Sequence, residues 1–234
     1  MRQFLIETHM HTAETSFCGK VPARQGIRIY KELGYDGVCI TDHFCDLFFD
    51  SLGSMPWKKK VDIFLEGYRT TKDEGLKTGI KVMLGMEYAF PGTNDDMLIY
   101  GFDEDFLYSN ENMHLLNKEE LKKLASENNL LLIQAHPFRK RVSRTYDDIV
   151  DGFEGFNGHP GHESMNDKAY RHALDFGGII ISGSDFHREG EGGTGGIYLN
   201  ELPENSFELA DILRQIKTPL MRKINMKRVE NKIG

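Results

Sequence analysis

Histidine and carboxylate residues recur along the chain, each time just after a short apolar run that is typical of a β-strand. The runs cover residues 4–6, 38–40, 82–84, 130–133 and 179–181. Helical patterns separate the runs, and this alternation predicts a parallel sheet built from βα units. None of the clusters falls within a predicted helix. The residues that follow the five runs are His9 and His11, Asp42 and His43, Glu87, His136, and Asp185 and His187.

These residues have the chemistry of metal ligands. Neutral imidazole and carboxylate groups bind Zn²⁺, Mn²⁺ and Fe²⁺. Ligands from five strands converge in a closed barrel more readily than in an open sheet, and barrels carry such residues beyond the C-terminal ends of their strands. Loop hydrogen bonds or helix caps explain any one cluster alone, but the position of the whole set favours a multinuclear metal centre. The sequence therefore predicts an α/β fold, a distorted (βα)₇ barrel with parallel strands.

Local patterns assign seven strands and the helices between them. After the first strand, the predicted strands cover residues 37–40, 80–86, 97–102, 130–134, 152–156 and 178–182, with a further short strand over 197–199. Helices are predicted over about 22–31, 57–77, 164–176 and 206–216. Another helix follows Asn117, which forms a capping box with Glu120.

The composition is that of a globular protein with one large domain. The chain has 234 residues, and its net charge of −7 gives no global attraction to nucleic acid or to an anionic membrane. Its three cysteines form no Cys-x-x-Cys pair, and its N-terminal apolar run is too short for a signal peptide. We therefore expect a cytoplasmic protein in which residues 1–234 form a single domain, with a C-terminal helix and basic tail over 215–234.

The ordered motifs resemble those of the polymerase and histidinol phosphatase (PHP) family. They are His-x-His, Thr-Asp-His, a lone Glu, Ala-His-Pro and Gly-Ser-Asp-x-His, and they extend from about Ile6 to His187. The resemblance implies a (βα)₇ barrel that holds two or three divalent ions (Mn²⁺, Zn²⁺ or Fe²⁺) and hydrolyses phosphate esters. The family includes histidinol phosphatases, other small-molecule and nucleotide phosphoesterases, and exonuclease domains of bacterial replicative polymerases.

Carried over by position, the resemblance implies three metal sites that share ligands. The expected ligands are His9, His11 and Asp185 for one ion, His136 for a second, Glu87 as the bridge between these two, and His43 and His187 for a third. Asp42, in the Thr-Asp-His motif, is a further candidate ligand. Glu87, Asp185 and His187 are the residues expected to support catalysis.

Two positions depart from the family's motifs. Cys18 stands where the family often has Asp or His, about seven residues after the first motif. A thiolate suits Zn²⁺ and suits Mn²⁺ poorly, but a small buried residue explains Cys18 equally well. Asp96 stands where many members have a histidine, at the start of the strand after the bridging glutamate. His114 is the alternative ligand, although a surface position before the Asn117 cap explains it more simply.

Two ions that share a carboxylate lower the pKa of a bound water and supply hydroxide near neutral pH for attack on phosphorus. A third metal ion or a protonated histidine could assist the leaving oxygen, with His187 and His159 as the candidate histidines. Arg139 and Arg188 are candidates for binding the phosphate, because each follows a ligand motif and arginine makes bidentate contacts to phosphate. A solvated surface position is the alternative for both.

Three functions fit this pattern. The first is a metal-dependent phosphatase for a small phosphomonoester, with histidinol phosphate as the named candidate. The second is a nuclease or nucleotide phosphodiesterase, which the basic clusters at 58–60 and 139–144 favour. The third is a non-catalytic metal-binding regulatory domain, and it is the least favoured because only the Cys18 position is clearly altered. We predict a phosphoesterase that acts on a small phosphoester, with a nucleotide or short oligonucleotide as the alternative substrate.

Overall fold

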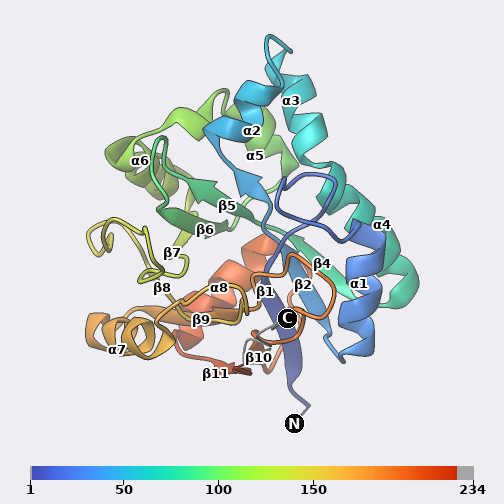
Figure 1. Cartoon of the computed structure of the whole chain (residues 1–234), viewed down its shortest axis with the longest axis vertical. Helices are drawn as coiled ribbons and strands as arrows, with labels where there is room; N and C mark the ends of the chain where they lie inside the picture. Colours follow the sequence, from blue (N-terminus) through green and yellow to red (C-terminus); the bar gives the residue numbers. More distant parts are fainter. Residues whose placement is uncertain (1, 226–234) are drawn as a thin grey trace, which may run out of the picture.

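The computed structural model describes residues 2–225, in which the strands form two sheets (Figure 1). The first sheet has the order β11-β10-β1-β2-β4, and the second has the order β3-β5-β6-β7-β8-β9. The strands are β1 (Phe4–Met10), β2 (Gly37–Ile40), β3 (His43–Phe44), β4 (Lys81–Leu84), β5 (Met86–Ala89), β6 (Asp96–Tyr100), β7 (Leu131–Gln134), β8 (Gly152–Asn157), β9 (Ile179–Gly183), β10 (Ile197–Leu199) and β11 (Leu220–Met221).

Helices surround the two sheets. They are α1 (Ala23–Glu32), α2 (Asp46–Ser51), α3 (Trp57–Phe64), α4 (Glu66–Thr78), α5 (Glu104–Ser109), the 3₁₀ turn η1 (Met113–Leu115), α6 (Lys118–Asn128), α7 (Asn166–Phe176) and α8 (Ser206–Ile216). Helices α1 and α4 pack together beside β2 and β4, and α7 packs against β8 and β9 (Figure 1). The mixed α/β class that the sequence predicts is confirmed.

Backbone hydrogen bonds join the two sheets beside the candidate site. Gly85 N donates to Ile40 O over 2.9 Å, and Glu87 N donates to Asp42 O over 3.1 Å. On the other side of the site, His11 N donates to Phe186 O over 3.1 Å. The predicted closed (βα)₇ barrel is not confirmed, because within residues 2–225 the strands are divided between two sheets.

Strand β6 corrects the prediction that the strands are all parallel. It runs antiparallel to both of its neighbours, β5 and β7. A parallel pair needs a crossover of about a dozen residues or more, and only residues 90–95 separate β5 from β6. Because β6 is reversed, its first residue, Asp96, lies beside the C-terminal ends of β5 and β7. Strands β10 and β11 also pair antiparallel, at the edge of the first sheet.

Two predicted elements are each divided in the structure. Residues 57–77, predicted as one helix, form α3 and α4 with Leu65 between them. Residues 80–86, predicted as one strand, form β4 and β5 with Gly85 between them. This division places Glu87 inside β5, in the second sheet, rather than at the end of a strand. The short elements β3, α2, α5 and β11 were not predicted.

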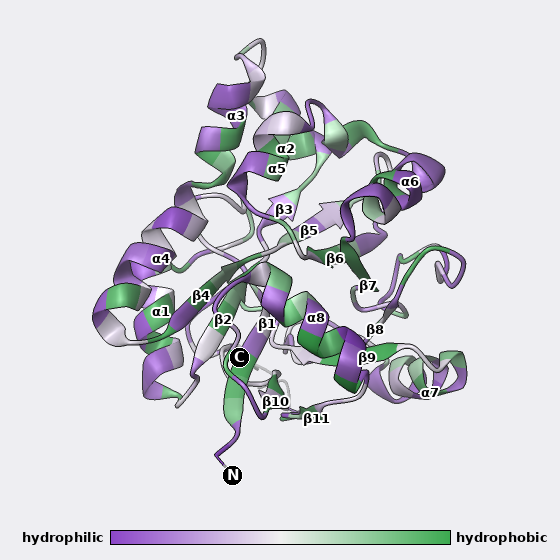
Figure 2. Ribbon diagram, turned by 180° about the vertical axis from the view of Figure 1, so that it is seen from behind, coloured by the Kyte–Doolittle hydropathy of each residue, from purple (hydrophilic) through white to green (hydrophobic). Residues whose placement is uncertain are grey.

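Helix boundaries follow the expected signals. Pro22 directly precedes α1, where its missing N–H leaves no helical hydrogen bond unmade. Asn117 caps α6, and the Glu120 side chain completes the predicted capping box. The buried residues of α1 recur at helical spacing and are Ala23, Gly26, Ile27 and Tyr30. Figure 2 shows hydrophilic residues on the outer turns of α1, α3 and α4 and hydrophobic residues on β6.

Helix α8 is held by apolar packing, which gives a test of the fold. Leu213 is fully buried in a cluster that includes Leu98 of β6 and Leu131 of β7. We expect Leu213→Ala to lower the free energy of unfolding by about 3 kcal/mol, because truncation leaves a cavity. Leu174→Ala, at a position on α7 that is 50% exposed, is the control and should change it by less than about 0.5 kcal/mol. Equal effects in urea denaturation would contradict this packing.

The end of the chain is described only in part. The predicted final helix is present as α8, and residues 226–234 of the predicted basic tail lie outside the described residues. In the part of the chain that the structure covers, every helix is too short or too polar to cross a bilayer. The three cysteines, Cys18, Cys39 and Cys45, are all free thiols.

Candidate metal centre

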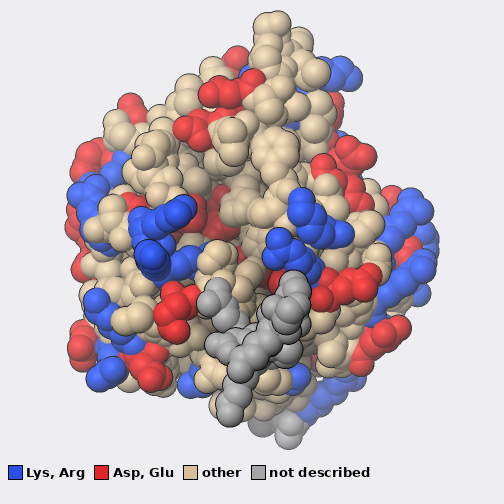
Figure 3. Space-filling view, viewed as in Figure 1, with Lys and Arg blue, Asp and Glu red and all other residues tan. Residues whose placement is uncertain are grey.

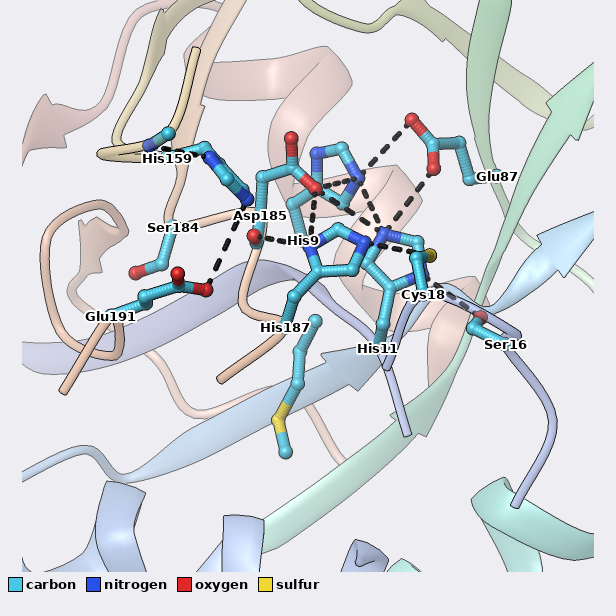
Figure 4. A network of polar contacts seen from close by, with 12 residues as sticks. His9, His11, Ser16, Cys18, Glu87, His159, Ser184, Asp185, His187 and Glu191 are labelled. Atoms are coloured by element: carbon cyan, nitrogen blue, oxygen red, sulfur yellow. Dashed lines mark hydrogen bonds and ion pairs between the residues drawn. The ribbon is translucent and has the colours of Figure 1, made fainter. Parts of the chain in front are cut away.

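Residues from four separate parts of the chain come together in one cluster, and Figure 4 shows His9, His11, Glu87 and Asp185 of this cluster. His9 lies in β1 and His11 directly follows it, Glu87 lies in β5, His136 follows β7 and Asp185 follows β9. All five side chains are buried. His136 and Asp185 have φ angles of 28° and 52°, which non-glycine residues rarely adopt. Backbone strain of this kind clusters at functional sites, where the surrounding structure holds it in place.

Three groups of side chains could each hold a metal ion, because their ligand atoms lie within 4.8 Å of one another. The groups are His9, His11 and Asp185; Glu87, Asp96 and His136; and His11, His43 and His187. Imidazole and carboxylate donors of this kind accept first-row divalent ions. The three groups contain all of the predicted ligands except Cys18 and Asp42.

Glu87 lies between the groups. Its Oε1 is 2.9 Å from His136 Nε2 and 3.3 Å from His9 Nε2. Its Oε2 is 2.9 Å from His43 Nδ1 and 3.2 Å from His11 Nε2. This Oε2 atom is buried and makes no hydrogen bond of good geometry within the described residues. A buried carboxylate oxygen needs a positively charged partner, and the position of Glu87 suits a carboxylate that bridges two ions.

Hydrogen bonds outside the cluster turn the Nε2 lone pairs of His9 and His11 toward each other. His9 Nδ1 donates to Glu154 Oε1 over 3.0 Å. His11 Nδ1 donates to Ser16 Oγ over 3.1 Å, and Ser16 Oγ donates to Asp42 Oδ1 over 2.6 Å. The two Nε2 atoms are 3.2 Å apart. Neutral imidazoles in these tautomers present two acceptors to each other, so the contact needs either a shared proton or a metal ion. These residues therefore fit a metal ion.

Glu154 is a functional residue that the sequence analysis missed. Besides its bond to His9, its Oε2 accepts hydrogen bonds from His136 N and Asn157 Nδ2, each over 2.9 Å. One buried carboxylate thus fixes the ring of one candidate ligand and the backbone of another. A glutamate inside the otherwise apolar run 152–156 was the signal that could have revealed it.

The position of Asp42 argues against its predicted role as a metal ligand. Its two oxygens accept hydrogen bonds from Thr12 N over 2.8 Å, Thr12 Oγ1 over 2.7 Å and Ser16 Oγ over 2.6 Å. These bonds occupy the carboxylate outside the three groups of ligand atoms. Asp42 instead orients His11 through Ser16, in the manner of a carboxylate that supports a metal-binding histidine.

Buried charge shifts the pKa values of the cluster. Burial alone would raise the pKa values of Glu87 and Asp185, but nearby imidazoles, and Arg139 in the case of Asp185, hold both pKa values well below the usual range of a carboxyl group. Burial alone would lower the pKa of His9, yet Asp185, Glu87 and Glu154 raise it well above its usual value. The carboxylates therefore stay ionised and attract positive charge in the form of protons or metal ions.

Cys18 lies against the third group. Its Sγ is 3.2 Å from His43 Nε2 and 2.9 Å from His187 Nε2. Burial acts to raise the pKa of the thiol, but the hydrogen bond from His43 and its charge outweigh burial and lower that pKa. Cys18 is half-buried and faces two imidazoles, which are not the surroundings of a small apolar core residue.

Asp96 joins the cluster, and His114 does not. Asp96 Oδ2 is 3.7 Å from His136 Nε2, and burial near Glu87 raises the pKa of Asp96 to about 6. The prediction that His114 lies on the surface is wrong, because the ring is buried among aromatic residues. Its centroid lies 4.5 Å from that of Phe49 and 5.7 Å from that of Trp57. Phe49 and Trp57 are likewise core residues.

Arg139, predicted to bind phosphate, extends into the cluster. Its Nη2 donates to Asn157 Oδ1 over 2.9 Å and also to Asp185 Oδ2. Its Nε is buried and has no hydrogen-bond partner among residues 2–225. The alternative of a solvated arginine is therefore wrong at this position. The guanidinium lies close enough to Asp185 to contact an anion bound at the group formed by His9, His11 and Asp185.

The other two predicted substrate-binding residues lie further from the three groups. Arg188 is exposed, with its Nη1 3.8 Å from Glu191 Oε1. His159 is buried, with its ring centroid 5.2 Å from that of His187. Burial lowers the pKa of His159 to about 4 and the pKa of His187 to about 2. Because both rings are neutral near pH 7, neither supports the predicted protonated histidine.

A cavity of about 590 Å³ opens beside the second group. Asp96 and His136 form part of its wall, and Arg139, Lys140 and Arg141 form another part. Figure 3 shows a hollow in this face with acidic atoms on its floor and Lys or Arg side chains on both sides. The volume is in the range of small-molecule sites, and the lining places positive charge next to candidate metal ligands.

Glu154 provides a test of the supporting hydrogen bonds. We expect Glu154→Gln to weaken Mn²⁺ binding by about 10- to 100-fold, because the amide no longer offers His9 Nδ1 a charged acceptor. Isothermal titration with Mn²⁺ measures the affinity. Glu201→Gln, at an exposed position, is the matched control and should bind as the wild type does. Unchanged affinity in Glu154→Gln would contradict the orienting role of Glu154.

The chain belongs to the PHP domain family, whose model matches residues 7–194. The matched range contains all three groups of candidate ligands, the supporting residues and Arg139. No curated protein matches the sequence. The resemblance seen in the ordered motifs is thus confirmed at the level of the family.

Solved structures with this fold have little sequence in common with the chain. PsfC from Pseudomonas syringae PB-5123 matches with a TM-score of 0.64 at 15% identity, over 95% of this chain and 92% of PsfC. A Bacteroides vulgatus ATCC 8482 protein that contains a predicted PHP-like metal-dependent phosphoesterase gives 0.61 at 15% identity, over 91% of this chain and 64% of that one. A Chromobacterium violaceum amidohydrolase with bound sulfate and no metal gives 0.53 at 14%, over 88% and 95%. These matches show a shared fold.

Proposed function

We propose that the protein is a metal-dependent hydrolase that releases phosphate from a small phosphomonoester, with histidinol phosphate as the first candidate. The observation that carries the proposal is the cavity, because it joins candidate metal ligands (Asp96, His136) to a basic wall (Arg139, Lys140, Arg141). A phosphate ester needs both: cations near the phosphorus and positive charge around the remaining oxygens. The volume of the cavity favours a small substrate over a long polymer.

The ligands that we propose are shared between neighbouring ions. His9, His11 and Asp185 would hold one ion; Glu87, Asp96 and His136 would hold a second; and His43 with His187 would hold a third. Ions bound there, of Mn²⁺, Zn²⁺ or Fe²⁺, would activate a water molecule and neutralise phosphoryl charge. Glu87 connects the groups through its contacts to His9, His11, His43 and His136.

The remaining residues bind and position the substrate. Arg139 Nε is the buried donor that lacks a partner, so a phosphoryl oxygen is a suitable acceptor for it. His159 accepts a hydrogen bond from Gly161 N at Nδ1 over 2.9 Å, which leaves its Nε2 as the proton-bearing atom. We propose that this Nε2–H donates to the substrate. Arg188 is exposed, so it would contact the substrate only at the edge of the site.

A nucleotide is the second candidate substrate. Lys140 and Arg141 add two positive charges to the cavity wall beyond that of Arg139, more than a single phosphate group requires. A single domain over residues 1–234, closure of the strands into a (βα)₇ barrel and a cytoplasmic location also remain proposals.

Phosphate release from a panel of esters tests the function. Protein stripped with a chelator and reloaded with Mn²⁺ is incubated with histidinol phosphate, nucleoside monophosphates and short oligonucleotides. We expect chelator-sensitive phosphate release that is fastest with a monoester. Oligonucleotide cleavage without monoester hydrolysis would replace the phosphatase by the nuclease, and the absence of both phosphate release and oligonucleotide cleavage would contradict both.

A further inference from the structure

The loop that carries Cys18 is built onto the two histidines that the sulfur contacts. Ser16 Oγ accepts a hydrogen bond from His43 N over 3.1 Å, and Lys20 N donates to His187 O over 2.8 Å. Gly19 N donates to Ser16 O over 2.9 Å and closes the turn around Cys18. Residues on both sides of the cysteine are thus tied to the backbone of its histidine partners, and the position of the sulfur is fixed by these bonds.

A ring nitrogen of each histidine faces the sulfur of Cys18. His187 Nδ1 lies 2.8 Å from Asp185 O, which is an acceptor only, so Nδ1 carries the proton and Nε2 presents a lone pair to Cys18. His43 lies on the other side of the sulfur, with its Nδ1 2.9 Å from the Glu87 carboxylate and its Nε2 3.2 Å from Cys18 Sγ. A metal ion between the sulfur and the two Nε2 atoms would accept a lone pair from each of the three.

The distances from Cys18 Sγ to the two imidazole nitrogens suit one ion. Zn–N bonds of about 2.0–2.1 Å and Zn–S bonds of about 2.3 Å place N and S ligands on a tetrahedral zinc about 3.5 Å apart. The observed separations of 3.2 Å and 2.9 Å between Cys18 Sγ and the two Nε2 atoms need shifts of only a few tenths of an ångström. Cys18 is half-buried, so the site is reachable from solvent.

We propose that Cys18, His43 and His187 form a sulfur-containing site that selects Zn²⁺ over Mn²⁺, which makes the metal centre heterometallic. The other two groups each contain a carboxylate, which suits hard ions such as Mn²⁺, whereas a thiolate with two imidazoles suits Zn²⁺. Binding the ion displaces the thiol proton to solvent, so the thiolate is formed by the metal itself. This inference rests on the proposed function only in taking the cluster to bind metal.

Cobalt spectroscopy tests the site without reference to activity. Chelator-stripped protein is titrated with Co²⁺, whose bond to a thiolate gives a charge-transfer band in the near ultraviolet. We expect the band in the wild type and in Cys45→Ser, a second half-buried cysteine that serves as the control. Cys18→Ser should lack the band and bind Zn²⁺ at least about 100-fold more weakly, while its Mn²⁺ content is unchanged.

Two results would overturn the inference. One is a wild-type protein that binds Co²⁺ without the band, and the other is a band that persists in Cys18→Ser. Circular dichroism of each variant establishes that it is folded, and Cys18→Asp provides a second variant that removes the sulfur but keeps an anionic ligand. Phosphate release is measured on the same samples. A wild-type protein that shows the band but has no activity would contradict the phosphatase proposal and still support the zinc site.

Discussion

Asp185→Asn is expected to reduce phosphate release by at least about 10³-fold, equivalent to about 4 kcal/mol of transition-state stabilisation. Asp185 Oδ1 lies 3.4 Å from His11 Nε2 and 3.6 Å from His9 Nε2, and its Oδ2 accepts a hydrogen bond from Arg139. The amide keeps the volume of the side chain but removes the anionic ligand of the first group. Asparagine also tolerates the positive φ of 52° at this position, so the fold should be retained.

The matched control is Asp175→Asn, at an exposed position on α7. It makes the same chemical change and should leave phosphate release within about twofold of the wild type, because it lies outside the metal centre. The melting temperatures of both variants should remain near that of the wild type. Asp185→Asn protein that is folded and retains most of its turnover would exclude Asp185 as a metal ligand.

Glu87→Gln is expected to remove metal as well as activity. The Glu87 carboxylate contacts His9, His11, His43 and His136, so its charge serves more than one ion. An amide presents one oxygen and one NH₂ group. The NH₂ group would donate to an imidazole nitrogen whose lone pair is needed to bind the metal ion. We expect the Mn²⁺ content to fall by at least one equivalent and phosphate release to fall by about 10³-fold or more.

Elemental analysis of dialysed protein and a phosphate assay on the same sample measure both effects. Glu127→Gln, on the exposed surface of α6, is the control and should match the wild type in both. If Glu87→Gln loses activity but keeps its full complement of metal, the carboxylate does not bridge ions, and its role would be limited to orienting the substrate.

The candidate metal ligands were the part of the site that sequence could predict. Histidine and carboxylate residues follow one apolar run after another, so the set that includes His9, His136 and Asp185 stood out without knowledge of the fold. Asp96 was harder, because its position depends on the direction of β6, which the strand pattern does not encode. The short connection over residues 90–95 contained that information, since it excludes a parallel crossover.

Side chains that support the ligands were not predictable in the same way. Glu154 lies inside a strand, and only the three-dimensional arrangement of the two sheets brings it to His9 and to the backbone of His136. Asp42 was assigned as a ligand because it precedes His43, but its hydrogen bonds to Thr12 and Ser16 depend on a loop conformation that local pattern does not determine. Ligand identity follows from chemistry and strand position, whereas ligand support follows from tertiary contacts.

Anomalous diffraction from crystals of Mn²⁺-soaked protein tests the metal centre most directly. We expect peaks at the group of His9, His11 and Asp185 and at the group of Glu87, Asp96 and His136, with Glu87 between the two ions. Mn²⁺-soaked crystals without a peak at either group would contradict the assignment of this buried cluster as a metal centre.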